Sequence, residues 1–137
     1  MPKTVGWVLM LCVLTGCHST PTENVAVGGT FPLARWNDLA LPVDLGFTPP
    51  GTCGRAVTSG TLTLDATAHH FSYTVHILNC HGLDEGSSQV DGTFVQSGDA
   101  LDVTILGTSY IHIYGTILPD RIVITNGQRL EFTRGRS

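Results

Sequence analysis

The chain has 137 residues, of which 42% are hydrophobic and 13% are charged, and its formal net charge is −4 at pH 7. This length accommodates one domain of ordinary size and excludes two large ones. The acidic balance and the lack of a basic cluster exclude a nucleic-acid-binding surface, so we expect no nucleic-acid partner. Threonine and valine are abundant, and strong helix formers are scarce after the first dozen residues, which favours an all-β fold.

The beginning of the chain has the pattern of a secretion signal. Lys3 precedes an almost wholly apolar stretch at positions 5–14, which is too short to span a bilayer but has the length of a signal-peptide core. The sequence Leu14-Thr15-Gly16-Cys17 follows, with small residues before a cysteine. It resembles the lipobox of bacterial lipoproteins. The resemblance implies a signal peptide at residues 1–16 and a mature chain that begins at Cys17.

In that family the mature cysteine carries two or three acyl chains such as palmitate, and two or more chains anchor a protein stably to a membrane. The resemblance therefore implies a membrane partner, reached through a lipid anchor at Cys17. An aspartate in place of His18 would resemble an inner-membrane retention signal, so we expect the cell envelope, at the outer membrane, facing the periplasm or the cell surface. Residues 17–27 are expected to form the lipidated cysteine and a flexible tether.

Two further cysteines, Cys53 and Cys80, belong to the expected mature chain. In an oxidising compartment an isolated pair most simply forms a disulfide. This bond closes a loop of about 28 residues, which stabilises the fold by roughly 3–4 kcal/mol on the chain-entropy model. Two free thiols or a pair of metal ligands are the alternatives.

Residues 28–137 form a single expected domain, in which apolar and polar residues alternate between short turn sequences. This period of two predicts β-strands, and Asn126-Gly127 is the strongest hairpin signal. We expect about eight strands, near residues 28–35, 41–46, 58–65, 69–79, 88–96, 100–107, 109–118 and 121–134, the last being one strand or two. Short connections predict an antiparallel up-and-down meander that forms a small barrel, with an immunoglobulin-like β-sandwich as the alternative.

Three short segments add a second resemblance: Gly29-Thr30-Phe31, residues 35–42, and the run from Leu130 to Arg134. They resemble segments of small bacterial lipoproteins with a lipocalin-like barrel. Phe31 stands where tryptophan is typical, and Arg134 matches the late basic residue that packs over that ring. The resemblance covers residues 28–134, and since lipocalins often carry small apolar molecules, it implies such a ligand here.

The face expected to point into the barrel consists of eighteen medium-sized or large side chains. They are Leu62, Leu64, Phe71, Tyr73, Val75, Ile77, Val90, Phe94, Leu101, Val103, Ile105, Ile111, Ile113, Ile117, Ile122, Ile124, Leu130 and Phe132. So many side chains can fill the interior of an eight-stranded barrel. A packed core without a pocket is therefore the alternative to a ligand cavity.

The sequence contains no recognisable catalytic motif. His70 and His76 share one face of an expected strand but lie about 20 Å apart. His76 could share a metal ion with His112 only if their strands are neighbours. The pair Asp84-Glu85, flanked by glycines, is typical of a solvated turn. We therefore expect a protein that is not an enzyme and that has no cofactor and no metal.

Tyr110, His112 and Tyr114 alternate with apolar residues and so share one face of their expected strand. If this face is outward, two aromatic rings and an imidazole form a candidate surface for a partner. Ordinary cross-strand packing of tyrosines on an exposed face is the alternative.

These observations favour a membrane-anchored envelope lipoprotein that is a non-catalytic binding or interaction module, for a small apolar ligand or an envelope protein. The alternative is a structural or stress-related lipoprotein with a filled core and no small-molecule site.

Overall fold

A computed structural model describes residues 26–46, 54–82, 84–106 and 111–135. Within these ranges the chain forms ten strands in one sheet, and none of it is a helix long and apolar enough to cross a membrane. The strands are β1 (Gly29–Trp36), β2 (Leu39–Ala40), β3 (Val43–Asp44), β4 (Arg55–Asp65), β5 (His70–Asn79), β6 (Asp84–Ser97), β7 (Ala100–Ile105), β8 (His112–Ile117), β9 (Arg121–Thr125) and β10 (Arg129–Thr133).

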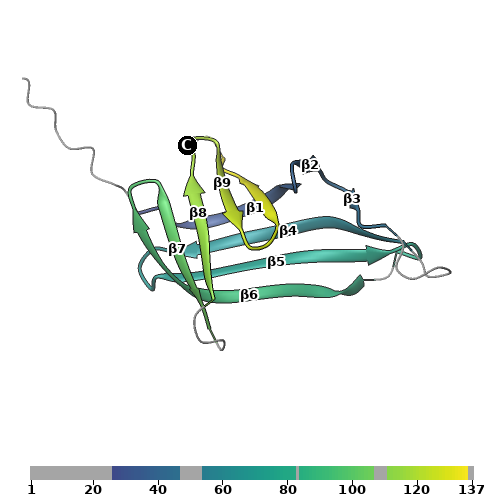
Figure 1. Ribbon diagram of the computed structural model, residues 1–137, viewed down its shortest axis with the longest axis horizontal. Coiled ribbons are helices and arrows are strands. Elements are labelled where there is room, and N and C mark those ends of the chain that lie inside the picture. Colours follow the sequence, from purple (N-terminus) through teal and green to yellow (C-terminus); the bar gives the residue numbers. More distant parts are fainter. Residues whose placement is uncertain (1–25, 47–53, 83, 107–110, 136–137) are drawn as a thin grey trace, which may run out of the picture.

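The sheet closes into an eight-stranded antiparallel barrel. Each strand from β4 to β10 pairs with the next, β10 pairs with β1, and β1 pairs back with β4. The short strands β2 and β3 extend the sheet beside β1 and β4. In Figure 1, β8 runs steeply across the long strands β4, β5 and β6. The expected up-and-down barrel is confirmed, and the β-sandwich alternative is wrong.

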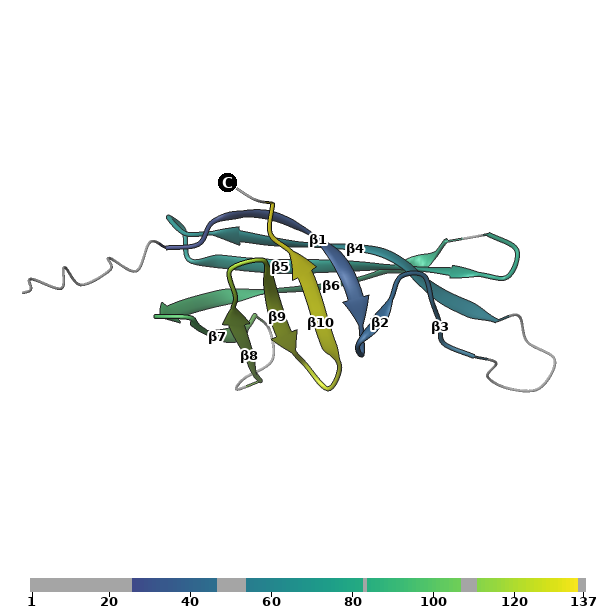
Figure 2. The same cartoon turned by 90° about the horizontal axis from the view of Figure 1, so that it is seen from above.

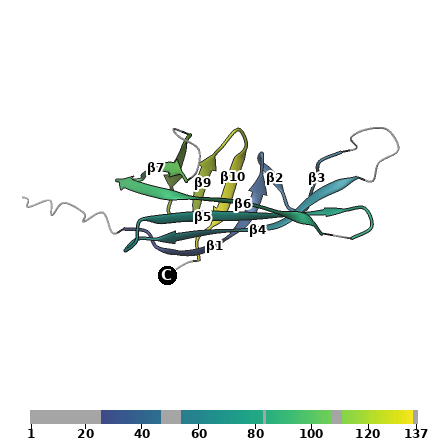
Figure 3. The same ribbon diagram turned by 90° about the horizontal axis from the view of Figure 1, so that it is seen from below.

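The three long strands extend well past the rest of the barrel. Figure 2 and Figure 3 show β4, β5 and β6 continuing beyond the β9–β10 hairpin, with β3 beside β4 at that end. Pairing reflects this difference in length, because β5 pairs with β6 from Thr93 back to Asp84, whereas β7 pairs with β6 only from Gly92 onward.

One expected strand differs from those observed, and the choice between one strand and two at residues 121–134 is decided in favour of two. The strand expected at 41–46 is replaced by β2 and β3, which lie on either side of Leu41 and Pro42. Proline has no N–H to donate to a ladder, which explains the interruption. The segment 121–134 is two strands, joined at Asn126 and Gly127, where Gly127 has a φ of 64°.

Alternation along the strands buries one face of the sheet inside the barrel. The buried core consists of Phe31, Leu33, Trp36, Val43, Val57, Leu62, Leu64, Phe71, Tyr73, Val75, Phe94, Leu101, Val103, Ile113, Ile117, Ile122, Ile124, Leu130 and Phe132. Ile77, Val90 and Ile105 are partly buried against it. The expectation that Ile111 points inside is wrong: it is 46% exposed and lies one residue before β8, at the end of the paired segment, where its carbonyl oxygen accepts a hydrogen bond from the N–H of Ile105.

Buried glycines occupy inward positions where the barrel wall is tightest. A Cβ atom on Gly60 would lie 2.8 Å from the carbonyl oxygen of Thr74, and one on Gly115 would lie 2.7 Å from Cδ1 of Ile124. A Cβ atom on Gly92 would lie closer still to its nearest neighbour, the carbonyl oxygen of Thr104. The missing side chains allow neighbouring strands to approach and coil.

Candidate functional site

A cleft of about 350 Å³ opens at one mouth of the barrel. Its apolar lining consists of inward-facing side chains, among them Trp36, Tyr73, Ile77 and Val90. Ser88 and the β9–β10 turn, residues 126–128, complete the lining. We call this space the mouth cleft. Because its walls combine core side chains with a polar rim, it can hold an apolar group and leave a polar end in water.

Tyr73 is fixed in the mouth cleft by contacts on several sides. Nδ2 of Asn126 donates a hydrogen bond of 2.9 Å to its hydroxyl group. The ring packs edge-on against Phe71 at a centroid distance of 5.9 Å and lies 6.4 Å from the ring of Phe132. The β9–β10 turn is thereby held against β5, on the far side of the cleft.

The interior beyond the cleft is filled by the core side chains. Phe71 and Phe132 have no exposed surface, and Ile113, Ile122 and Ile124 are equally buried. A ligand of the kind implied by the lipocalin resemblance would therefore be held at the mouth and not in the centre of the barrel.

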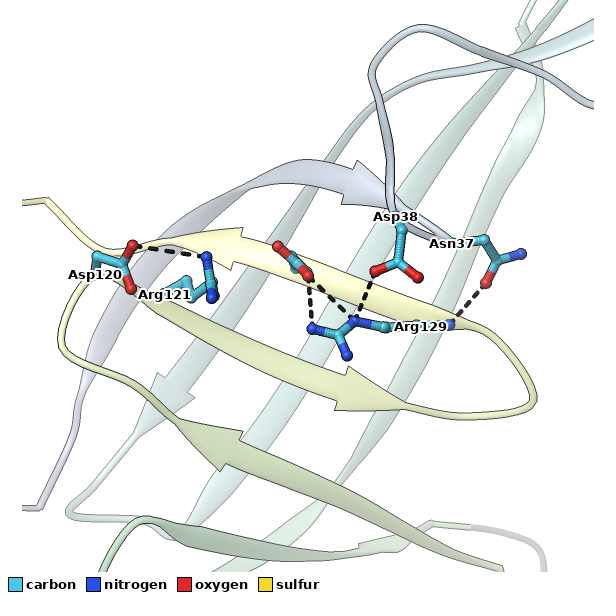
Figure 4. Close-up of polar contacts among 6 residues, drawn as sticks. Asn37, Asp38, Asp120, Arg121 and Arg129 are labelled. Atoms are coloured by element: carbon cyan, nitrogen blue, oxygen red, sulfur yellow. Dashed lines mark hydrogen bonds and ion pairs between the residues drawn. The ribbon is translucent and has the colours of Figure 1, made fainter.

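A second polar group of residues lies on the outside of β10. Nη2 and Nε of Arg129 donate hydrogen bonds of 2.7 and 3.1 Å to Oε1 of Glu131, and Nε lies 3.0 Å from Oδ1 of Asp38 (Figure 4). The backbone N–H of Arg129 also donates to Oδ1 of Asn37, at 2.8 Å. The hydrogen bond from Arg129 to Glu131 is the main cause of a raised pKa at Arg129, and the charges of Asp38 and Glu131 add to it.

This network has the character of a structural clasp. Asn37 and Asp38 have positive φ angles of 47° and 67°, and their contacts with Arg129 hold the β1–β2 turn on β10. Glu131 is only 6% exposed although it points outward. Since each charged group here has a partner of opposite sign, the cluster needs no external ion.

A neighbouring groove of about 490 Å³ includes Arg35, Arg121 and Arg134. Nη1 of Arg121 lies 3.8 Å from Oδ2 of Asp120. Nη1 of Arg134 donates a hydrogen bond of 2.9 Å to the carbonyl oxygen of Leu118. The guanidinium of Arg134 is thus bonded to the β8–β9 turn. The groove mixes both signs of charge.

The histidines on the strands pair with aspartates of adjacent strands. His70 lies 3.9 Å from Asp91, and His76 lies 3.7 Å from Asp84. His112 on β8 is separated from β5 by two strands, so it does not join His76. In the described ranges no group of three or more His, Cys, Asp or Glu side chains could hold a metal ion.

Two residues of the candidate aromatic surface lie together on the outside of the barrel. The rings of His112 and Tyr114 are stacked, with centroids 6.4 Å apart and planes 18° apart, and Nδ1 of His112 is 2.9 Å from Oδ1 of Asp102. Val95 on β6 and Tyr114 on β8 both pair with Asp102 on β7, one from each side. The sequence pattern did not identify Val95 as part of this surface. Tyr110 lies outside the described residues.

The predicted lipid-attachment residue Cys17 and the lipobox before it also lie outside the described residues, as does Cys53. Cys80 directly follows β5. The disulfide between Cys53 and Cys80 therefore stays a prediction. Comparison of the chain with family models, curated proteins and solved structures gave no match. Any functional assignment rests on the residues and geometry described above.

Proposed function

We propose that the protein is a lipid-anchored, non-catalytic binding module of the bacterial cell envelope, which holds a small apolar ligand in the mouth cleft. The observation that carries this proposal is the cleft itself, whose volume of about 350 Å³ is lined by side chains of the barrel's inner face. This volume falls within the range of small-molecule pockets, roughly 300–1,000 Å³.

The lining supports an apolar ligand in particular. Trp36 and Tyr73 offer aromatic surface, and Ile77 and Val90 are only partly covered by the core. Covering the remaining apolar area with a ligand removes it from water, at about 25 cal/mol per Å². Ser88, Asn126 and Gln128 at the rim provide hydrogen-bonding groups for a polar end.

The binding test uses the neutral apolar probe N-phenyl-1-naphthylamine and the chain secreted with Cys17→Ser. Ser88→Phe places a ring in the mouth cleft, whereas Ser87→Phe places the same ring on the opposite face of β6, since Ser87 pairs with His76 and Ser88 with Val75. We expect probe binding to be retained in Ser87→Phe and reduced at least tenfold in Ser88→Phe. Equal binding by both variants would place the probe elsewhere and refute the proposal.

The anchor is tested separately, in a bacterial host. The lipobox Leu14-Thr15-Gly16-Cys17 predicts a diacylglyceryl group on Cys17 and recovery of the protein in the membrane fraction. The parent chain should incorporate radiolabelled palmitate, and Cys17→Ser should lose this label. Equal labelling of the variant and the parent chain would refute lipidation of this residue.

The disulfide is part of the same proposal, because it requires an oxidising compartment. β4 begins two residues after Cys53, β5 ends one residue before Cys80, and the first residue of β4, Arg55, pairs with Asn79. This register supports the proposed pairing, because Asn79 immediately precedes Cys80. Peptide mapping without reduction should recover Cys53 and Cys80 in one linked species, and two alkylated free thiols would contradict this.

A structural lipoprotein with no small-molecule site remains the second candidate, and the filled barrel interior favours it. It predicts that native mass spectrometry of the protein purified from its host shows the bare lipidated chain. The proposal of a binding module predicts a further non-covalent mass that is lost in Ser88→Phe.

A further inference from the structure

Half of β6 is paired on one side only. β5 pairs with β6 between Asp84 and Thr93, but β7 pairs with β6 only between Gly92 and Ser97. In the part of the chain that the structure describes, no strand pairs with the other edge of β6 between Ser87 and Gln89. Figure 1 shows this edge as the lower border of β6, beyond β7. An open strand edge carries unpaired backbone donors and acceptors.

Two backbone hydrogen bonds show which groups face the open edge. The N–H of Phe94 on β6 donates to the carbonyl oxygen of His69, so the backbone groups of Phe94 face β5. The N–H of Leu106 donates to the carbonyl oxygen of Asp91, so the backbone groups of Asp91 face away from β5. Because the direction alternates along an antiparallel strand, the N–H and C=O groups of Gln89 and Ser87 also point to the open edge.

The side chains between these groups face the barrel mouth. Ser88 and Val90 alternate with Ser87 and Gln89 and belong to the lining of the mouth cleft. A strand added to this edge would therefore place every second side chain over the cleft. The edge and the cleft form one continuous surface, with main-chain groups on one side and apolar side chains on the other.

The charged residues at the two ends of the open edge are acidic. They are Asp84, which lies 3.7 Å from His76, and Asp91, which lies 3.9 Å from His70. Among the arginines of the described ranges, Arg35, Arg121, Arg129 and Arg134 lie on or beside β1, β9 and β10, and Arg55 alone lies on β4. An occupant with lysine or arginine near its ends would complement this distribution.

We propose that the open edge of β6 binds an extended segment of an envelope protein by β-strand addition, with apolar residues alternating with polar or basic ones. The N–H and C=O groups of Gln89 and Ser87 supply the main-chain hydrogen bonds, and the mouth cleft receives the apolar side chains. This inference deepens the proposed function and rests on it in one respect, namely that the mouth cleft accepts apolar groups.

The probe is the octapeptide Val-Lys-Val-Thr-Val-Lys-Val-Thr, acetylated and amidated, titrated calorimetrically into the chain secreted with Cys17→Ser. Two further peptides carry N-methyl groups, either on the four valines or on the four other residues. Since only alternate amides of an added strand face β6, we expect one methylated peptide to bind at least tenfold more weakly and the other to retain binding within about threefold. No binding of the parent peptide, or equal binding of both methylated peptides, would overturn the proposal.

A matched pair of protein variants tests the edge itself. Gln89→Pro removes a backbone N–H that faces the open edge and leaves the β5 ladder bonds in place, whereas Gln89→Ala keeps this N–H. We expect Gln89→Pro, with an unchanged circular dichroism spectrum, to weaken peptide binding at least tenfold and Gln89→Ala less than twofold. Peptide affinity unchanged by Gln89→Pro, or loss of the native spectrum in Gln89→Pro combined with a tenfold loss in Gln89→Ala, would contradict the assignment.

The remaining outcomes separate this inference from the proposed function. Strand addition is wrong and the proposed function stands if the peptide does not bind, while N-phenyl-1-naphthylamine binds the chain and binds Ser88→Phe at least tenfold more weakly. If the peptide shows the methylation pattern and the probe does not bind, the apolar-ligand proposal fails. Dimers in sedimentation that Gln89→Pro dissociates would assign the edge to a second copy of this chain and overturn the proposal.

Discussion

The side-chain amide of Asn126 donates a hydrogen bond of 2.9 Å to the hydroxyl of Tyr73, 53 residues earlier in the chain. This bond joins the tip of the β9–β10 hairpin to β5 across the mouth of the barrel. Both residues line the mouth cleft, so the bond fixes one part of its wall.

Asn126→Ala should lower the free energy of unfolding by about 1 kcal/mol, because it removes a partly buried hydrogen bond. Gln128→Ala is the matched control, since its backbone carbonyl still accepts from Asn126. Urea denaturation measures both. In the double variant with Tyr73→Phe, the loss should not exceed that of the larger single variant, because both changes remove the same bond. Additive losses would show that the bond does not contribute.

Glu131→Gln should destabilise the protein by about 1–2 kcal/mol, because the change removes the negative charge that lies against the Arg129 guanidinium at a nearly buried position. Glu131 is almost buried, whereas Asp38 contacts the same guanidinium from an exposed position. Asp38→Asn should therefore have a smaller effect on the urea midpoint. The reverse order of the two effects would contradict the role of Glu131 in the clasp.

The pH dependence of stability should contain a contribution from Asp65. Backbone N–H groups of Ala68 and Thr67, each 2.9 Å from Oδ1, lower the pKa of Asp65 below its ordinary value of 3.8. The lowered pKa adds stability that is fully present above the ordinary value and is lost as the pH falls through the folded-state value. Between pH 5 and pH 2 we expect the free energy of unfolding to fall more in the wild type than in Asp65→Asn, mainly below the ordinary pKa of 3.8. Parallel curves in urea titrations would refute this.

The barrel could be predicted from the sequence because its strands alternate regularly. Phe71, Tyr73 and Val75 follow the period of two, and their side chains are buried as expected. The same rule failed at Ile111, since periodicity does not show where a strand leaves the barrel wall. Periodicity also could not show that β6 extends back to Asp84, whereas its pairing with β7 begins only at Gly92.

The candidate sites were harder to predict than the fold. Asn37 and Arg129 are 92 residues apart, and their contact depends on which strands become neighbours when the barrel closes. The mouth cleft has the same origin, because Trp36, Tyr73 and Asn126 come from three separate strands or turns. No local pattern in the sequence identifies such a group. The outward position of His112 and Tyr114, by contrast, followed directly from alternation.

Gly92→Ala should destabilise the barrel by about 1–3 kcal/mol, because the added methyl group meets the backbone of Thr104 and a strand must move to accommodate it. Gly135→Ala is the control, since nothing lies within 4 Å of a Cβ atom at that position. Thermal unfolding should show a lower midpoint for Gly92→Ala alone. Equal midpoints in the two variants would mean that the wall is not tightly closed at β6 and β7.

The proposed binding of an apolar ligand at the barrel mouth can be followed residue by residue by amide NMR with N-phenyl-1-naphthylamine. Trp36 is the one tryptophan outside the predicted signal peptide, so its indole N–H gives a single resonance in the mature chain. We predict that shifts concentrate at this indole and at Ser88, Val90 and Gln128, and that Val95 and Tyr114 on the outer surface do not move. Shifts centred on Val95 and Tyr114, with the Trp36 indole unchanged, would contradict binding at the barrel mouth.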